Sequence, residues 1–148
     1  MTTTFKFRIN GQTFESIVNV LTGKQILEIS GLEPPQEFEL LLKLQKQEFE
    51  PVQLDEMIDL DRHGIEMFSA KPYKNIKFFV DDEPIHTKEC FLTPAEILRL
   101  VSKDPKEYYL KQILGHKEIT YKNDEDHILA MKSNLKFTTC KREGATVS

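Results

Sequence analysis

The side chains that could do chemistry in this chain stand apart from one another. Neither cysteine lies in a CxxC motif, so the spacing predicts no zinc ribbon and no redox pair. The four histidines fall singly, and the acidic run Asp124-Glu125-Asp126 lacks the spacing of an oxygen-ligand loop for a cation. We therefore predict no catalytic residue, no metal site and no cofactor, and we expect that the chain is not an enzyme. These isolated residues are His63, His86, His116, His127, Cys90 and Cys140.

Composition and charge narrow the classes of partner. The 148 residues carry a net charge of -4 and the basic residues form no dense stripe, so no nucleic-acid-binding surface is predicted. The apolar runs are only a few residues long, against the roughly 20 residues of a membrane-spanning helix. The N-terminus has no basic segment followed by an apolar stretch, so no signal peptide is expected. These features predict a cytoplasmic protein with reduced thiols that binds neither nucleic acid nor membrane.

A pattern that occurs twice in the chain determines where these residues lie. Phe5-Lys6-Phe7-Arg8-Ile9 recurs as Ile76-Lys77-Phe78-Phe79-Val80. At the same spacing, Leu21-Thr22-Gly23-Lys24-Gln25-Ile26-Leu27 recurs as Leu92-Thr93-Pro94-Ala95-Glu96-Ile97-Leu98. Each copy of such a duplication is a complete folding unit. The predicted division is a domain at residues 1–71, a domain at residues 72–144 and an extension at residues 145–148.

Hydrophobic periodicity predicts the elements of the first copy. Phe5, Phe7 and Ile9 alternate with charged residues, which is typical of a half-buried strand, and Asn10-Gly11 suits a hairpin turn. Thr22 offers a hydroxyl as N-cap to the helix that follows. The apolar side chains expected on the buried side of this helix are Val20, Ile26, Leu27 and Ile29. The predicted elements are strands at 5–9, 12–18, 38–44, 50–54 and 64–69, a helix at 22–30, and a turn or 3₁₀ segment at 55–60.

The second copy repeats this order of elements. Thr93 caps a helix with Pro94 at its first position, where proline is best tolerated. Gly64 begins the last strand of the first copy and Asn134 stands at the equivalent place in the second, and both residue types tolerate the left-handed conformation. With the last strand parallel to the first, the fold class is α+β: two tandem β-grasp (ubiquitin-like) domains, each a mixed sheet with one helix packed across it. The predicted strands are 75–80, 108–114, 117–121 and 135–140.

The two copies resemble the tandem ubiquitin-like units of bacterial multiubiquitin-domain proteins, the modifiers of bacterial ubiquitination-like operons of the Bil or Bub type. The resemblance covers about residues 4–144. It rests on the Phe-Lys-Phe-x-Ile/Val strand, the Leu-Thr-x-x-x-Ile-Leu start of the helix, and the duplication. In such modifiers an E1-like enzyme adenylates the carboxylate of a C-terminal glycine, and an E2-like enzyme helps to pass it to a target.

The resemblance implies a function for the C-terminal segment, which the first copy lacks. Gly144 would be the conjugation residue, after a protease cuts between it and Ala145 and removes residues 145–148. Lys141, Arg142 and Glu143 would form the tail that the activating enzyme reads. The implied partners are an E1-like activating enzyme, an E2-like enzyme, a processing or deconjugating protease and target proteins, with antiphage defence as the setting.

Other functions stay open at this stage. The two units could form an adaptor that is never conjugated and that binds partners through its sheet surfaces. A glycine near a chain end is also common where it has no function. A sulfur carrier, which needs the same terminal glycine, is a weaker alternative because such carriers are generally single units. Exposed strand edges leave self-association open.

Overall fold

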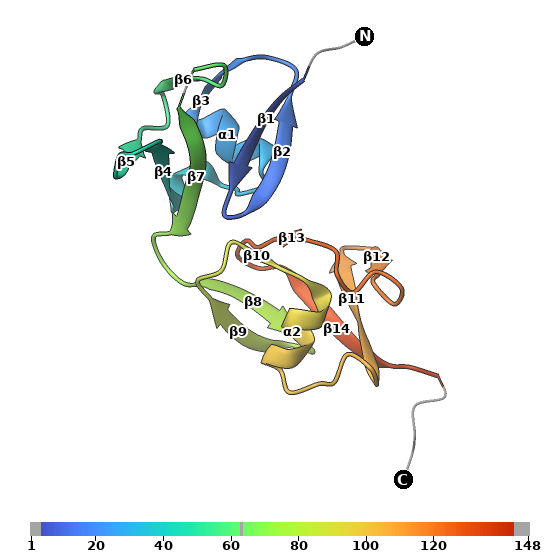
Figure 1. Cartoon of the computed structure of the whole chain (residues 1–148). Helices are drawn as coiled ribbons and strands as arrows, with labels where there is room; N and C mark the ends of the chain where they lie inside the picture. The colour runs from blue at the N-terminus through green and yellow to red at the C-terminus, as the bar shows by residue number, and fades with distance from the viewer. Residues whose placement is uncertain (1–3, 63, 144–148) are drawn as a thin grey trace. The chain divides into compact units, whose positions relative to one another are not determined.

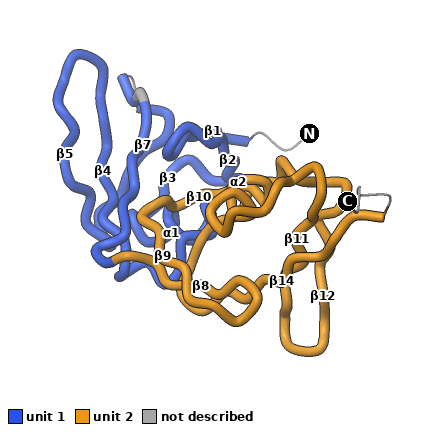
Figure 2. The backbone as a smooth tube through the Cα atoms, turned by 90° about the horizontal axis from the view of Figure 1, so that it is seen from below, with its two compact units in different colours: residues 1–74 blue, residues 75–148 orange. Residues whose placement is uncertain are grey.

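The computed structural model describes residues 4–62 and 64–143. The chain forms two compact units, which are coloured separately in Figure 2. The division between them falls between Lys74 and Asn75, a little beyond the predicted boundary at residue 71. Each unit is described below by itself.

Unit 1 is a five-stranded mixed sheet with one helix packed across it (Figure 1). The order of its strands is β2-β1-β7-β4-β5, so the last long strand, β7, occupies the middle of the sheet. Strand β7 runs parallel to β1 and antiparallel to β4. The elements are β1 (Phe5–Ile9), β2 (Gln12–Ser16), β3 (Val20–Thr22), α1 (Gly23–Ile29), the 3₁₀ helix η1 (Pro35–Glu37), β4 (Phe38–Leu44), β5 (Phe49–Val52), β6 (Met57–Asp59) and β7 (Ile65–Pro72).

Unit 2 has the same architecture. Its strand order is β12-β11-β14-β8-β9, so β14 takes the middle position and runs parallel to β8. The predicted α+β class, with two tandem β-grasp units, is confirmed. The elements are β8 (Ile76–Val80), β9 (Glu83–Thr87), β10 (Phe91–Leu92), α2 (Pro94–Leu100), β11 (Tyr108–Leu114), β12 (Lys117–Thr120), β13 (Leu129–Ala130) and β14 (Lys136–Lys141).

Both helices begin at the predicted threonine. The Thr22 hydroxyl accepts a hydrogen bond from the Gln25 N–H at 3.2 Å, and the Gln25 side-chain oxygen accepts from the Thr22 N–H at 2.9 Å. Thr93 and Glu96 make the same two bonds at 3.1 and 2.9 Å. These reciprocal bonds are capping boxes, which satisfy backbone N–H groups that a helix start otherwise leaves without partners.

The core of each unit contains the same aromatic pair. Phe7 and Phe68 meet edge to face with ring centroids 6.0 Å apart, and Phe78 and Phe137 do so at 6.0 Å. All four side chains are buried between the helix and the sheet. Because one partner of each pair lies on the last strand, packing of the core fixes that strand in place.

A turn residue also holds each last strand. Asn10 donates a side-chain hydrogen bond to the Ala70 carbonyl at 3.0 Å and accepts one from the Ala70 N–H at 2.8 Å. In unit 2 the carboxylate of Asp81 accepts from the N–H and the hydroxyl of Thr139 at 2.9 and 2.6 Å. Both turn residues have positive φ angles, of 50°. The turn of the first hairpin in each unit thus holds the last strand, through which the chain leaves that unit.

Several details of the prediction are wrong. The strand expected at 12–18 ends at Ser16, so Ile17 and Val18 lie in the loop that follows it. Residues 55–60 were expected to form a turn or 3₁₀ segment, but Met57–Asp59 is strand β6, which pairs antiparallel with β3. The 3₁₀ helix lies instead at Pro35–Glu37. Val20 and Ile29 were expected to be buried with the helix, but they are 41% and 38% exposed. Val20 lies on β3, where the next residue, Leu21, is the buried one, and Ile29 is the last residue of α1, whose buried apolar side chains are Ile26 and Leu27.

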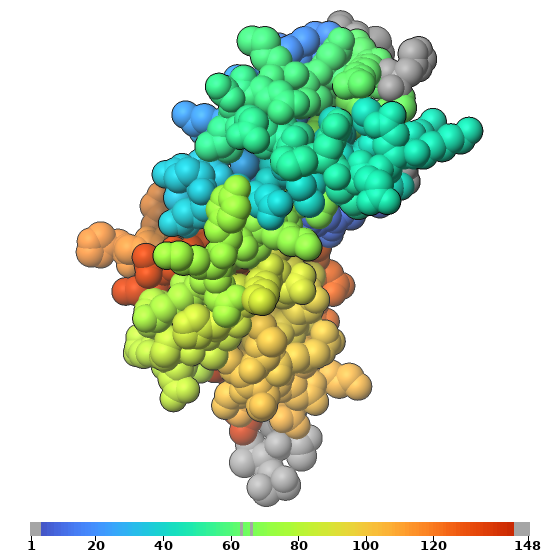
Figure 3. Space-filling model, turned by 90° about the vertical axis from the view of Figure 1, so that its left-hand side faces the viewer, coloured from blue at the N-terminus to red at the C-terminus, as the bar shows by residue number. Residues whose placement is uncertain are grey.

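Each sheet ends in a hairpin that extends away from its unit. Figure 2 shows β4–β5 and β11–β12 as long loops, and Figure 3 shows the tip of the β4–β5 hairpin, in cyan, standing out from the surface of unit 1. Phe49 in this hairpin is 42% exposed, and Leu114 and Ile119 in the other are 45% and 40% exposed. In the part of the chain that the structure describes, no helix is long and apolar enough to cross a membrane.

Candidate functional site

The candidate site is the point where the chain leaves the sheet of unit 2. Lys141, the last residue of β14, pairs with Tyr108, the first residue of β11, and its side chain is exposed. The next residue, Arg142, is still held, because its backbone N–H donates to the Glu107 carbonyl at 2.8 Å. Glu143 follows and is exposed. The described part of the C-terminal segment therefore ends one residue after an anchored arginine.

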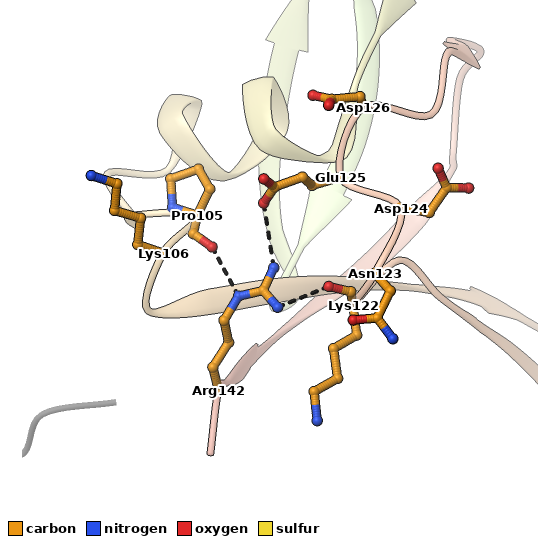
Figure 4. A pocket seen from close by; sticks show the side chains of 8 residues that line it. All are labelled: Pro105, Lys106, Lys122, Asn123, Asp124, Glu125, Asp126 and Arg142. Carbon is orange, nitrogen blue, oxygen red and sulfur yellow. Dashed lines mark hydrogen bonds and ion pairs between the residues drawn. The ribbon is translucent and has the colours of Figure 1, made fainter. Parts of the chain in front are cut away.

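The Arg142 side chain turns back into unit 2 (Figure 4). Its Nε donates to the carbonyls of Pro105 and Tyr108 at 2.9 and 3.2 Å, and Nη1 donates to the carbonyl of Lys122 at 2.8 Å. Nη2 lies 3.4 Å from a carboxylate oxygen of Glu125. With a side chain only 21% exposed, the guanidinium uses most of its donor fork inside the unit. We call this set of contacts the Arg142 anchor.

Two loops and the first residue of β11 supply the acceptors of the anchor. The loop that carries Glu125 is held against helix α2, because the Ala95 N–H donates to the Glu125 carbonyl at 3.1 Å. At the start of this loop the Tyr121 hydroxyl donates to the buried Gln112 side chain at 3.1 Å. Burial, with a smaller contribution from the Asp124 carboxylate, raises the pKa of Tyr121, so the hydroxyl stays protonated and able to donate.

Unit 1 has the same exit without the anchor. The Tyr73 N–H donates to the Glu37 carbonyl at 2.9 Å, as that of Arg142 does to Glu107. The Tyr73 side chain is 67% exposed, however, and the chain continues within a few residues into β8 of unit 2. The backbone hydrogen bond at the exit is therefore common to both units, whereas the guanidinium contacts occur in unit 2.

The structure places the predicted tail residues differently from one another. The side chains of Lys141 and Glu143 are exposed, and Gly144 and Ala145 lie outside the described residues. The Arg142 side chain is hydrogen-bonded within the folded unit. An activating enzyme that reads this guanidinium must first displace it from the anchor, so the role in tail recognition stays a prediction with that added condition.

The cysteines and histidines that the structure describes lie away from the Arg142 anchor or at its margin. Cys90 is buried, and Cys140 lies on β14. His127 pairs with Asp124 at 3.2 Å and packs on the ring of Tyr121. His63 lies outside the described residues. Among the described residues, no group of three His, Cys, Asp or Glu side chains could hold a metal ion.

Sequence reasoning missed the anchor because three of its acceptors are backbone carbonyls. Every residue has a carbonyl, so no residue type marks the positions at Pro105, Tyr108 and Lys122. The side chain that accepts from the guanidinium is Glu125, which stands in the acidic run for which no cation site was predicted. An arginine directly after a last strand was the available clue, and it does not identify its partners.

Replacing Arg142 by alanine is expected to lower the free energy of unfolding of unit 2 by about 2 kcal/mol, because hydrogen bonds from a charged donor are lost. Arg142→Lys should recover little, since one ammonium cannot reproduce the guanidinium fork. Urea denaturation of the full chain measures the change. Lys141→Ala removes a neighbouring exposed cation and serves as the control, with an expected effect within about 0.5 kcal/mol. Equal stabilities of the two alanine variants would contradict the anchor.

Comparison with known proteins finds a family match for the first unit. No curated protein matches the chain. Residues 5–72, which run from the start of β1 to the end of β7, match the model of the Multiubiquitin family. Unit 2 has the same strand order, the same capped helix and the same aromatic core pair. The chain thus carries a multiubiquitin-type domain at residues 5–72, and a second unit of the same fold follows it.

Proposed function

We propose that the chain is a ubiquitin-like protein modifier that is cleaved after Gly144 and conjugated through the carboxylate that this exposes. The observation that carries the proposal is the exit from unit 2. Strand β14 lies in the middle of its sheet and delivers the chain, through Arg142, to the edge of the unit. The equivalent exit of unit 1 leads directly into unit 2, so only the second exit precedes a glycine.

The anchor sets how far the reacting carboxylate can lie from unit 2. Gly144 is the second residue after Arg142, so its reach from the anchored backbone is about 7 Å when extended. An enzyme that adenylates this carboxylate must therefore approach the surface formed by the loops at Pro105 and Glu125, or else open the anchor. Glycine suits the reacting position because it places no side chain beside the carboxylate.

The proposed partners follow from this chemistry. An E1-like enzyme would adenylate the Gly144 carboxylate, an E2-like enzyme would help to transfer it to a target, and a protease would make the cut before Ala145. The proposed setting is a bacterial ubiquitination-like pathway in the cytoplasm, with antiphage defence as its purpose. The multiubiquitin-type domain at residues 5–72 supports this assignment.

The test is co-expression of the chain with the genes that neighbour its own, followed by intact-mass and peptide mass spectrometry. We expect a chain that ends at Gly144, together with adducts joined through that residue. The adaptor function predicts something different: an unprocessed C-terminus, and partner binding that survives deletion of residues 141–148. That outcome would overturn the proposed modifier function.

A further inference from the structure

Unit 1 has an exposed apolar hollow beside helix α1. Its walls are Ile17, Val18 and Ile29, which are 73%, 48% and 38% exposed, and the buried Leu21 forms part of its lining. The hollow is shallow, with a volume of about 430 Å³. Isolated exposed apolar residues are ordinary, but a group of them around one hollow marks an interaction surface.

A fixed loop presents these side chains. The Ser16 hydroxyl accepts from the Val18 N–H at 3.1 Å and donates to the Val18 carbonyl at 2.8 Å. At the other end of the loop, the Asn19 carbonyl accepts from the Leu60 N–H at 2.7 Å. Ile17 stands between these two attachments. The backbone around Ile17 therefore keeps its side chain exposed. A partner that covers Ile17 would lose little free energy to the ordering of this loop.

Unit 2 shows that the fold does not need these apolar residues. Its equivalent loop has the same turn, in which the Thr87 hydroxyl accepts from the Glu89 N–H at 3.0 Å. The residues in place of Ile17 and Val18, however, are Lys88 and Glu89. Because the same loop folds with charged side chains, the loop conformation does not require the apolar pair of unit 1.

The charges around the hollow indicate what covers it. The charged residues that line it are both glutamates, Glu15 and Glu28, and both are exposed. Lys6 lies 3.9 Å from Glu15, a weak pair in which both side chains are more than half exposed. At the position equivalent to Glu28, unit 2 has Arg99. The acidic rim is thus confined to the unit that also has the apolar wall.

We propose that this hollow binds a peptide segment of a partner protein in which an aliphatic or aromatic side chain stands next to lysine or arginine. The apolar side chain fills the hollow between Ile17, Val18 and Ile29, and the basic residue pairs with Glu15 or Glu28. The surface is distinct from the C-terminal segment, so the inference does not rest on conjugation. It gives the two units different roles, with partner recognition in unit 1.

The test selects peptides that bind the full chain from a display library of random 12-residue peptides. Peptides that also bind the I17K/V18E variant are removed. This variant carries the residues of unit 2 at both positions, so it is expected to fold. We expect selected peptides to share an apolar residue flanked by Lys or Arg. Synthetic versions should bind the variant at least about tenfold more weakly in fluorescence anisotropy, as for loss of central contacts in an interface.

A second variant and a matched control test the charge and the location. E15Q/E28Q should weaken binding and reduce its salt dependence, while leaving the apolar wall intact. K88I/E89V in unit 2 should leave the affinity unchanged. The proposal is overturned if no peptide depends on Ile17 and Val18, or if acidic flanks are selected. It is also overturned if analytical ultracentrifugation shows wild-type self-association that I17K/V18E abolishes, since a second copy would then be the occupant.

Discussion

Replacing Gly144 by valine is expected to abolish conjugates while unit 2 stays folded. Adenylation and transfer require the carboxylate of the terminal residue to enter an enzyme site along an extended backbone. A β-branched side chain at that residue crowds both the backbone and the reacting carbon. The fold itself should be unaffected, because the contacts that the described residues show at the exit of unit 2 are made by Arg142 and not by Gly144's neighbour Glu143.

Mass spectrometry of the co-expressed proteins measures this loss, and Val147→Ala is the matched control. Val147 lies beyond the proposed cut, so its substitution should leave both processing and conjugates at the wild-type level. A Gly144→Val chain that still forms adducts through its C-terminal segment would show that another residue carries the bond. Unfolding curves of the two variants should superimpose, which separates loss of chemistry from loss of fold.

Replacing Gly23 by proline is expected to unfold unit 1. The Gly23 N–H donates to the Glu56 carbonyl at 3.0 Å, and proline has no N–H to replace this donor. A Cβ at this position would also clash with the backbone carbonyl oxygen of Gln53 and lie 3.2 Å from a methyl carbon of Val52. The lost bond and the overpacking together should cost about 4 kcal/mol. A domain of this size has little stability beyond that to lose.

The reverse change in unit 2 provides the control. Pro94 stands at the equivalent first position of α2, so Pro94→Gly should cost only about 1 kcal/mol, chiefly through the freedom gained by the unfolded chain. Amide NMR spectra of the full chain during urea titration report on the two units separately. Gly23→Pro should remove the dispersed signals of unit 1 and leave those of unit 2. Retention of both sets would contradict the packing described for Gly23.

The parts of the fold that could be predicted from the sequence are those that local patterns determine. Alternation placed β1 at Phe5–Ile9, and threonine followed by a helical pattern placed the start of α1. The predicted strand at 38–44, which is rich in leucine, matches β4, in which buried and half-buried residues alternate along the whole length. Duplication then transferred each of these predictions to the second unit.

Features that depend on distant partners could not be predicted in this way. Strand β6 is only three residues long, and it forms because it pairs with β3. Residues 55–60 have no local pattern from which this pairing could be predicted. Ile29 is exposed at the end of α1, where Ile26 and Leu27 are the apolar side chains that the rest of the unit buries. The Arg142 anchor depends on carbonyls that the fold brings together from two loops and the start of β11. In each case the sequence shows the residue but does not show which distant residue lies next to it in the fold.

The parallel pairing of β14 with β8 has a mechanical consequence. The chain enters unit 2 through β8 and leaves it through β14, and these strands are direct neighbours that run in the same direction. Tension between the two ends of the unit therefore pulls the strands past each other in shear and loads their hydrogen bonds together, whereas an unzipping pull would break them one at a time. β1 and β7 give unit 1 the same geometry. A chain tethered by its C-terminal segment would thus resist forced extension at both units in series.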